Sequence, residues 1–213
     1  MSFSNHAEYL KFIEKRVLND QWRVGWFKTE INVDIYGLKC NLLFLGHSRH
    51  FESIKPFFFS RIQSVFIYPY SAVAMVFCQK EVDHSLIDGI LSSVREFIKK
   101  RIITTPEGVD WGIDVAYIAL VSVKKIPEYV KEYFRDFFEP IVDDQYMQEE
   151  YPGISGYKRI HKAVGMCLVD LATGNTYCHD DVFSREAGRL FKPELYLIER
   201  LENTLKKLLL SFL

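Results

Sequence analysis

Apolar residues recur at helical spacing in two separate segments of the chain, residues 6–19 and 85–101. In each segment apolar side chains stand three and four positions apart, the pattern of a helix with one buried face. Each segment also starts with two polar residues at the spacing of a capping box, Asn5 with Glu8 and Ser85 with Asp88. We therefore predict a helix in both segments. Two further helices are predicted to begin at Pro127 and Pro193, because proline is favoured in the first turn of a helix.

Between these helices the apolar residues form short runs that predict strands. The runs lie at residues 27–37, 38–48, 64–68, 72–80 and 114–123, and on either side of a turn within residues 162–180. The first two runs predict one hairpin and the next two a second hairpin. The nearly continuous apolar run DVAYIALVSV is typical of a strand buried on both faces. Strands alternating with helices predict an α/β protein with a central mixed β-sheet flanked by helices.

Composition narrows this picture to one domain of an ordinary soluble kind. The chain has 213 residues, 48% of them hydrophobic, and its 28 acids nearly balance its 27 bases. This length suits a single domain over residues 1–213, and the net charge of −1 argues against coating nucleic acid by bulk electrostatics. The N-terminus lacks a signal-peptide pattern and no apolar run reaches about 18 residues, so we expect a cytoplasmic protein without a membrane partner. Four scattered cysteines without a CxxC pair predict free thiols.

The order of predicted elements from about residue 61 to 178, with the runs AVAMVFCQK, DVAYIALV and AVGMCLVD, resembles the core of the PD-(D/E)XK nuclease superfamily. In that family one strand begins with Asp and the next ends in Glu-x-Lys. A helix, a buried strand, a second helix and a further strand follow. The N-terminal helix and hairpin and the C-terminal helix would be additions to this core. The resemblance implies a restriction-endonuclease-like fold and an association with DNA or RNA.

The chemistry implied by the resemblance needs two carboxylates to bind Mg²⁺ and a lysine to position the attacking water. Residues i and i+2 of a strand share a face, which is why the family uses Glu-x-Lys. Here the triplet is Cys78-Gln79-Lys80, so the lysine matches and the acid does not. Ser64 stands near the place of the upstream Asp. We expect a degenerate, inactive metal site, with Mg²⁺ only if other acids act; the candidate acids are Glu30, Asp34, Glu81 and Asp83.

Basic side chains supply candidate contacts to nucleic-acid phosphates. They lie in two clusters, KKR and YKRIHK, and the second interleaves a tyrosine with cations, as suits phosphate contact with base stacking. A solvated face is the alternative interpretation of both clusters. The candidate residues are Lys99, Lys100, Arg101, Lys158, Arg159 and Lys162.

Two other functions remain open at this point. The first is a noncatalytic interaction or regulatory module, including a homodimer formed through an aromatic surface such as Phe57–Phe59. The second is an active metal-dependent nuclease whose ligands come from the relocated acids. Polar pairs at His47 with His50 and at residues 178–181 contain metal-ligand types, but their spacing fits no zinc template.

Overall fold

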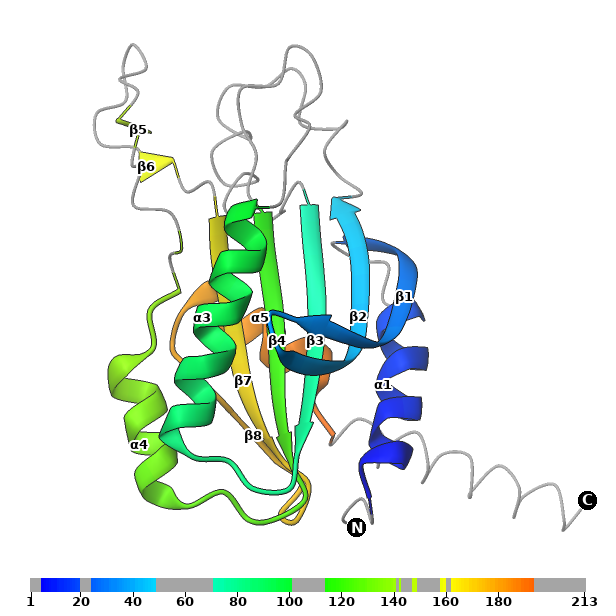
Figure 1. Cartoon of the computed structure of the whole chain (residues 1–213), viewed down its shortest axis with the longest axis vertical. Coiled ribbons are helices and arrows are strands. Elements are labelled where there is room, and N and C mark those ends of the chain that lie inside the picture. The colour runs from blue at the N-terminus through cyan, green and yellow to red at the C-terminus, as the bar shows by residue number, and fades with distance from the viewer. Residues whose placement is uncertain are drawn as a thin grey trace, which may run out of the picture.

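The computed structural model contains a six-stranded mixed β-sheet with helices on both faces (Figure 1). It describes residues 5–19, 24–48, 71–100, 114–140, 142, 147–148, 158–159 and 162–193. The helices of this part of the chain are α1 (His6–Asn19), α3 (His84–Lys100), α4 (Glu128–Phe137) and α5 (Val182–Phe191). The strands of the main sheet are β1 (Val24–Ile35), β2 (Leu38–Ser48), β3 (Ser71–Gln79), β4 (Asp114–Ser122), β7 (Lys162–Asp170) and β8 (Asn175–Cys178). The short strands β5 (Met147–Gln148) and β6 (Lys158–Arg159) pair with each other. The predicted α/β class is confirmed.

The strands of the main sheet lie in chain order, β1-β2-β3-β4-β7-β8. β1, β2 and β3 form an antiparallel meander, β3, β4 and β7 run parallel, and β8 returns antiparallel to β7. The hairpin of β1 and β2 turns at Tyr36 and Gly37, whose φ angles of 50° and 84° suit a type I′ turn. The carboxyl ends of the three parallel strands therefore meet at one end of the sheet, the lower end in Figure 1.

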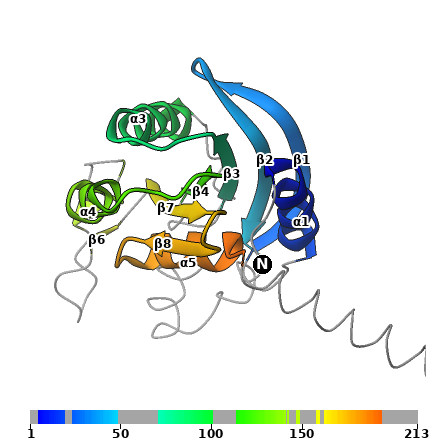
Figure 2. The ribbon, with the colours of Figure 1, turned by 90° about the horizontal axis from the view of Figure 1, so that it is seen from below.

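Two hydrophobic layers bury the two faces of the sheet. Side chains alternate along β3, so that Ala72, Ala74 and Val76 face the layer formed with α1 and α5. Val73, Met75 and Phe77 face the layer formed with α3 and α4. Figure 2 shows α3 and α4 on one side of the central strands and α5 on the other. Residues 115–121 of β4 are all buried, as the apolar run at 114–123 predicted.

Glycine is required where β7 passes the start of α5. A Cβ atom at Gly165 would lie 2.1 Å from the carbonyl oxygen of Phe183 and 2.8 Å from the amide nitrogen of Ser184. The next residue, Met166, donates its backbone N–H to Ser184 Oγ at 3.1 Å. Strand and helix are therefore in backbone-to-backbone contact, which only the missing side chain of Gly165 permits.

Several predicted elements are confirmed and others need correction. The helix at 6–19 is present, and Asn5 Oδ1 accepts from the Glu8 N–H at 3.0 Å, as its spacing indicated. The predicted pairing of residues 64–68 with residues 72–80 is wrong, because β3 pairs with β2 on one side and β4 on the other. Residues 64–68 themselves, Ser64 included, and the helix predicted from Pro193 onward lie outside the described residues.

The start of α3 and the whole of α5 also differ from the expectation. Asp83, not Ser85, caps α3: its Oδ1 accepts from the Leu86 N–H at 2.9 Å. α5 was not predicted, although Asp181 caps it by accepting from the N–H groups of Phe183 and Ser184. Asp181 belongs to the group of polar residues that suggested metal ligands, and its carboxylate is used as a helix cap instead.

Candidate functional site

The end of the sheet that carries Lys80 is the place where the resemblance puts a site. Gln79, Ser122 and Asp170, the last residues of β3, β4 and β7, lie side by side in the sheet. We call this region the Lys80 end and define it as Lys80, Glu81, Ser122, Lys124, Lys125 and Asp170. Open α/β sheets bind ligands beyond the carboxyl ends of their parallel strands, so this is the end to examine.

The two candidate acids nearest to Lys80 are occupied by other partners. Glu81 forms an ion pair with Lys124, and the hydrogen bond from that ammonium lowers the pKa of the Glu81 carboxyl. Asp83 caps α3, and hydrogen bonds from the Leu86 N–H and the Ser85 hydroxyl lower its pKa. Both carboxylates are exposed and charged, but within the described part of the chain neither belongs to a group of side chains that could hold a metal ion.

Glu30 and Asp34 lie on β1, the edge strand, with β2 between them and β3. Neighbouring strands are about 4.8 Å apart, so the two inter-strand spacings from β1 to β3 amount to roughly 10 Å. Glu30 pairs with Lys28 at 2.5 Å, and Asp34 accepts from the Gly37 N–H at 3.0 Å within the hairpin turn. The structure therefore does not bring these acids to Lys80.

The position of the expected metal-binding acid, Cys78, is half-buried and holds a thiol in place of a carboxylate. Burial raises the pKa of the Cys78 thiol to about 12, with a smaller contribution from Cys40. Its backbone N–H is satisfied by Asn41 Oδ1 at 2.7 Å. Tyr9 of α1 is fully buried nearby, and desolvation, together with the thiols of Cys167 and Cys78, raises its pKa well above the ordinary value. This surrounding layer of thiols and phenol offers Mg²⁺ none of the carboxylate oxygens that it prefers.

Asp170 is a buried acid at the Lys80 end that the sequence analysis did not single out. It is fully buried, and Oδ2 accepts from the Ile126 N–H at 3.0 Å while Oδ1 accepts from the Thr173 N–H at 2.9 Å. Beside it, Ser122 Oγ donates to the carbonyl oxygen of Lys124 at 2.7 Å. Both polar groups hold the loops that leave β4 and β7. An acid that ends an otherwise apolar run and precedes a Thr-Gly turn was the available signal.

The acids and thiols of the Lys80 end do not form a metal site. Across the described ranges, no three His, Cys, Asp or Glu side chains come close enough to hold a metal ion. The side chain of His47 and all of His50 lie outside the described residues. Of the other pair, His179 Nδ1 is 3.0 Å from Asp181 Oδ2, the helix cap. The residues present therefore do not fit the Mg²⁺ that the resemblance implies.

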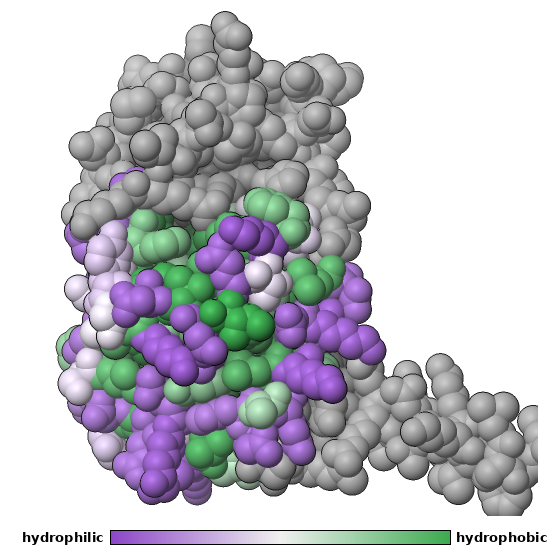
Figure 3. All heavy atoms as spheres, turned by 45° about the vertical axis from the view of Figure 1, so that its right-hand side comes forward, coloured by the Kyte–Doolittle hydropathy of each residue, from purple (hydrophilic) through white to green (hydrophobic). Residues whose placement is uncertain are grey.

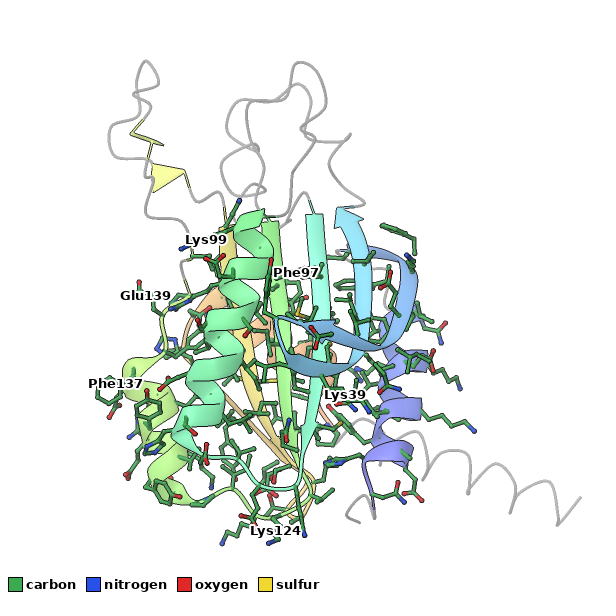
Figure 4. The ribbon with its side chains drawn as sticks, in the orientation of Figure 1. Lys39, Phe97, Lys99, Lys124, Phe137 and Glu139 are labelled. Atoms are coloured by element: carbon green, nitrogen blue, oxygen red, sulfur yellow. The ribbon has the colours of Figure 1, made fainter. Side chains whose placement is uncertain are left out.

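Lys99 and Lys162, one residue from each basic cluster, lie at the opposite end of the sheet. Lys162 begins β7, and its Nζ donates to the carbonyl oxygen of Lys99 at the end of α3, at 3.0 Å. Figure 4 shows Lys99 and Lys124 at opposite ends of the molecule. The 17 residues of α3 separate the two ends by about 25 Å at 1.5 Å per residue.

Lys99 and Lys162 therefore do not neighbour Lys80. Lys158 and Arg159 form β6, while Arg101 and the side chain of Lys100 lie outside the described residues. The basic side chains that the structure does place beside Lys80 are those of Lys124 and Lys125, both exposed.

Comparisons with protein-family models, curated proteins and solved structures find no match for this chain. Among the described helices, none has the length and apolar character to cross a membrane.

Proposed function

We propose that this chain is a noncatalytic, nuclease-like module that associates with nucleic acid through the Lys80 end. The order of β3, α3, β4, α4 and β7 supports the proposal, because it is the order of strand, helix, strand, helix and strand in the region on which the PD-(D/E)XK resemblance rests. In this fold Lys80 directly follows β3, one of the central strands, as the lysine of Glu-x-Lys does in the family.

One observation carries the proposal: Lys80, Lys124 and Lys125 are exposed together at the carboxyl ends of β3 and β4, around a position without metal-binding acids. Lysine ammonium groups contact phosphates as point charges and fix a nucleic acid without reading its sequence. Glu81 is the exposed acid among the residues that define the Lys80 end. Its ion pair with Lys124 reduces the electrostatic repulsion between the Glu81 carboxylate and a phosphate.

The binding test measures fluorescence anisotropy of labelled single-stranded and double-stranded oligonucleotides over a salt series. The variant is Lys80→Ala with Lys124→Ala and Lys125→Ala. The matched control is Lys11→Ala with Lys15→Ala and Lys39→Ala, since these lysines are equally exposed on α1 and β2. Loss of three phosphate contacts should reduce the slope of log K against log salt by about 2 to 3. An unchanged slope in the first variant, or an equal loss in the control, would exclude the Lys80 end.

A cleavage assay separates the noncatalytic proposal from an active enzyme. With Mg²⁺ or Mn²⁺ present, the protein should leave the same oligonucleotides intact, since the residues around Lys80 do not fit a metal ion. Metal-dependent cleavage that disappears in Lys80→Ala would refute this part of the proposal.

The alternative function, a protein-interaction module, is favoured by a different observation. Phe137 and Tyr129 of α4 are 72% and 56% exposed, although both are large apolar side chains. The homodimer surface first considered, Phe57–Phe59, lies outside the described residues. The exposed residues of α4 support an interaction surface of another kind, which is developed below.

A further inference from the structure

A row of aromatic side chains runs along the side of α4 that borders α3. Tyr129, Tyr133 and Phe137 are spaced four residues apart, so they lie on one side of the helix. Figure 4 shows Phe137 at the margin of the molecule, pointing away from α3 and the sheet. Three aromatic side chains in one row form a continuous surface, unlike the single exposed apolar residues that are common on proteins.

The rings in this row are held in fixed positions before any partner binds. The rings of Tyr133 and Phe137 stack with centroids 4.9 Å apart, and His84 of α3 stacks on Tyr133 at 4.3 Å. The Tyr133 hydroxyl donates to both carboxylate oxygens of Asp88, at 2.7 and 2.8 Å. Because stacking and hydrogen bonds already restrict these side chains, binding would cost little of their conformational entropy.

Acidic side chains border the row on both sides. Asp88 lies on the α3 side, and Glu132 and Asp136 precede Tyr133 and Phe137 in α4, on the solvent side of the row. Arg135 pairs with Asp136 at 3.3 Å, so the surface has three acids and one base. We call this surface the acidic aromatic face and define it as Asp88, Tyr129, Glu132, Tyr133, Arg135, Asp136 and Phe137.

We propose that the acidic aromatic face binds a protein segment in which arginine side chains alternate with apolar ones. An arginine guanidinium can stack on a tyrosine or phenylalanine ring and pair with a neighbouring carboxylate at the same time. The apolar side chains of such a segment would cover Phe137 and Tyr129. This surface is separate from the Lys80 end, and its partner does not depend on nucleic-acid binding there.

The charges argue against the two other classes of partner. Nucleic-acid bases stack well on aromatic side chains, but the phosphates that accompany them would be repelled by the bordering acids. A second copy of the same face would oppose acid to acid, and like charges across an interface are unfavourable. Complementary charge therefore selects a basic partner.

The experiment uses a short fluorescein-labelled peptide that alternates arginine with leucine and serine, and anisotropy measures its binding to the full chain. The first variant is Tyr129→Ala with Phe137→Ala, and the second is Glu132→Gln with Asp136→Asn. The control is Phe27→Ala with Ile31→Ala, which removes two apolar side chains of β1 that are 60% and 62% exposed. Figure 3, turned toward the β1 side, shows apolar surface between hydrophilic side chains there.

We expect the wild type to bind the arginine peptide and to leave unbound a peptide with glutamate in place of arginine. The aromatic variant should bind about tenfold more weakly. The charge variant should bind a few-fold more weakly, with a smaller salt dependence, and the β1 control should match the wild type. Far-UV circular dichroism and the thermal midpoint show that each variant is folded. All the changed side chains are exposed.

Three results would overturn the proposal. The first is absence of binding to the arginine peptide in the wild type. The second is an equal loss of binding in the β1 control, which would indicate nonspecific apolar adhesion. The third is binding of oligothymidylate that the aromatic variant abolishes, which would show that the face stacks bases instead.

Discussion

Replacing Asp170 with alanine should destabilise the fold strongly, because this carboxylate accepts two backbone hydrogen bonds. The Ile126 N–H is buried, so alanine at position 170 would leave this donor without an acceptor, and water could not take the place of the lost carboxylate. An unsatisfied buried donor costs about 1 to 3 kcal/mol, and the value should lie near the upper limit for a bond to a carboxylate. The Thr173 N–H is only part-buried, so its loss should cost about 1 kcal/mol. Together these give a loss of about 3 to 4 kcal/mol.

Urea-induced unfolding followed by far-UV circular dichroism measures this loss. Asp170→Asn keeps one acceptor oxygen but places an amide NH₂ group opposite the other backbone donor. Its unfolding free energy should therefore lie between those of Asp170→Ala and the wild type. Asp180→Ala is the control, because that side chain is 95% exposed and its contact with Arg185 is 3.7 Å long. It should change the unfolding free energy by less than about 0.5 kcal/mol.

The same variants test whether Asp170 is structural or chemical. Unfolding free energies of Asp170→Ala and the wild type that agree within about 0.5 kcal/mol would refute the role assigned from the hydrogen bonds. Loss of a metal-dependent activity in Asp170→Asn at unchanged stability would show that the carboxylate acts in chemistry.

Three further predictions concern packing, thiol reactivity and pH. Gly165→Ala should lower the unfolding free energy by about 3 kcal/mol, because its Cβ would collide with the α5 backbone. Gly89 lies on α3 with no atom within 4 Å of an added Cβ, so Gly89→Ala should instead raise the unfolding free energy by about 0.5 to 1 kcal/mol. Equal changes in the two variants, measured by urea unfolding, would contradict the close contact of Gly165 with α5. Iodoacetamide should label the exposed thiol of Cys178 first. It should label Cys40 and Cys78 slowly, because burial raises the pKa of these two thiols to about 12. Mass spectrometry that finds Cys78 labelled first would refute this prediction. Burial lowers the pKa of His6 from 6.5, partly offset by the backbone of Gln79 and Val121, so the unfolded chain binds its proton more readily. The free energy of unfolding should therefore fall as pH decreases from 6.5 toward the lowered pKa of His6. Urea titrations at several pH values should show a smaller decline in His6→Gln than in the wild type. Identical pH profiles of the two proteins would exclude His6 as the cause.

The sequence predicted the local elements of this fold well because their signals are local. Helical spacing located α1, α3 and α4, and the apolar run at 114–123 located β4. Strand pairing was harder, since it depends on contacts between distant residues. The prediction that residues 64–68 pair with β3 failed because β2, which is further away in sequence, occupies that edge of β3.

The candidate site was predicted in part. Lys80 does follow a central strand, as its motif indicated, and the lack of a carboxylate at Cys78 is matched by the burial of that position. The distance of Lys99 from Lys80 could have been inferred from the sequence: a helix that starts near Lys80 and runs 17 residues must carry its last turn to the far end of the sheet. Asp170 was missed, and Asp181 was grouped with metal-ligand residue types although it caps a helix. The role of both acids depends on which backbone amides their carboxylates contact after folding.

The length of α3 sets a minimum size for any nucleic acid that contacts both ends of the sheet. The helix separates Lys80 from Lys99 by about 25 Å, and successive nucleotides of a B-form strand advance by about 3.4 Å. Seven such steps cover about 24 Å, so a B-form strand of about eight nucleotides is the shortest that could reach from one end to the other. Shorter oligonucleotides can touch one end alone, so affinity measured against oligonucleotide length would show a step only if both ends take part.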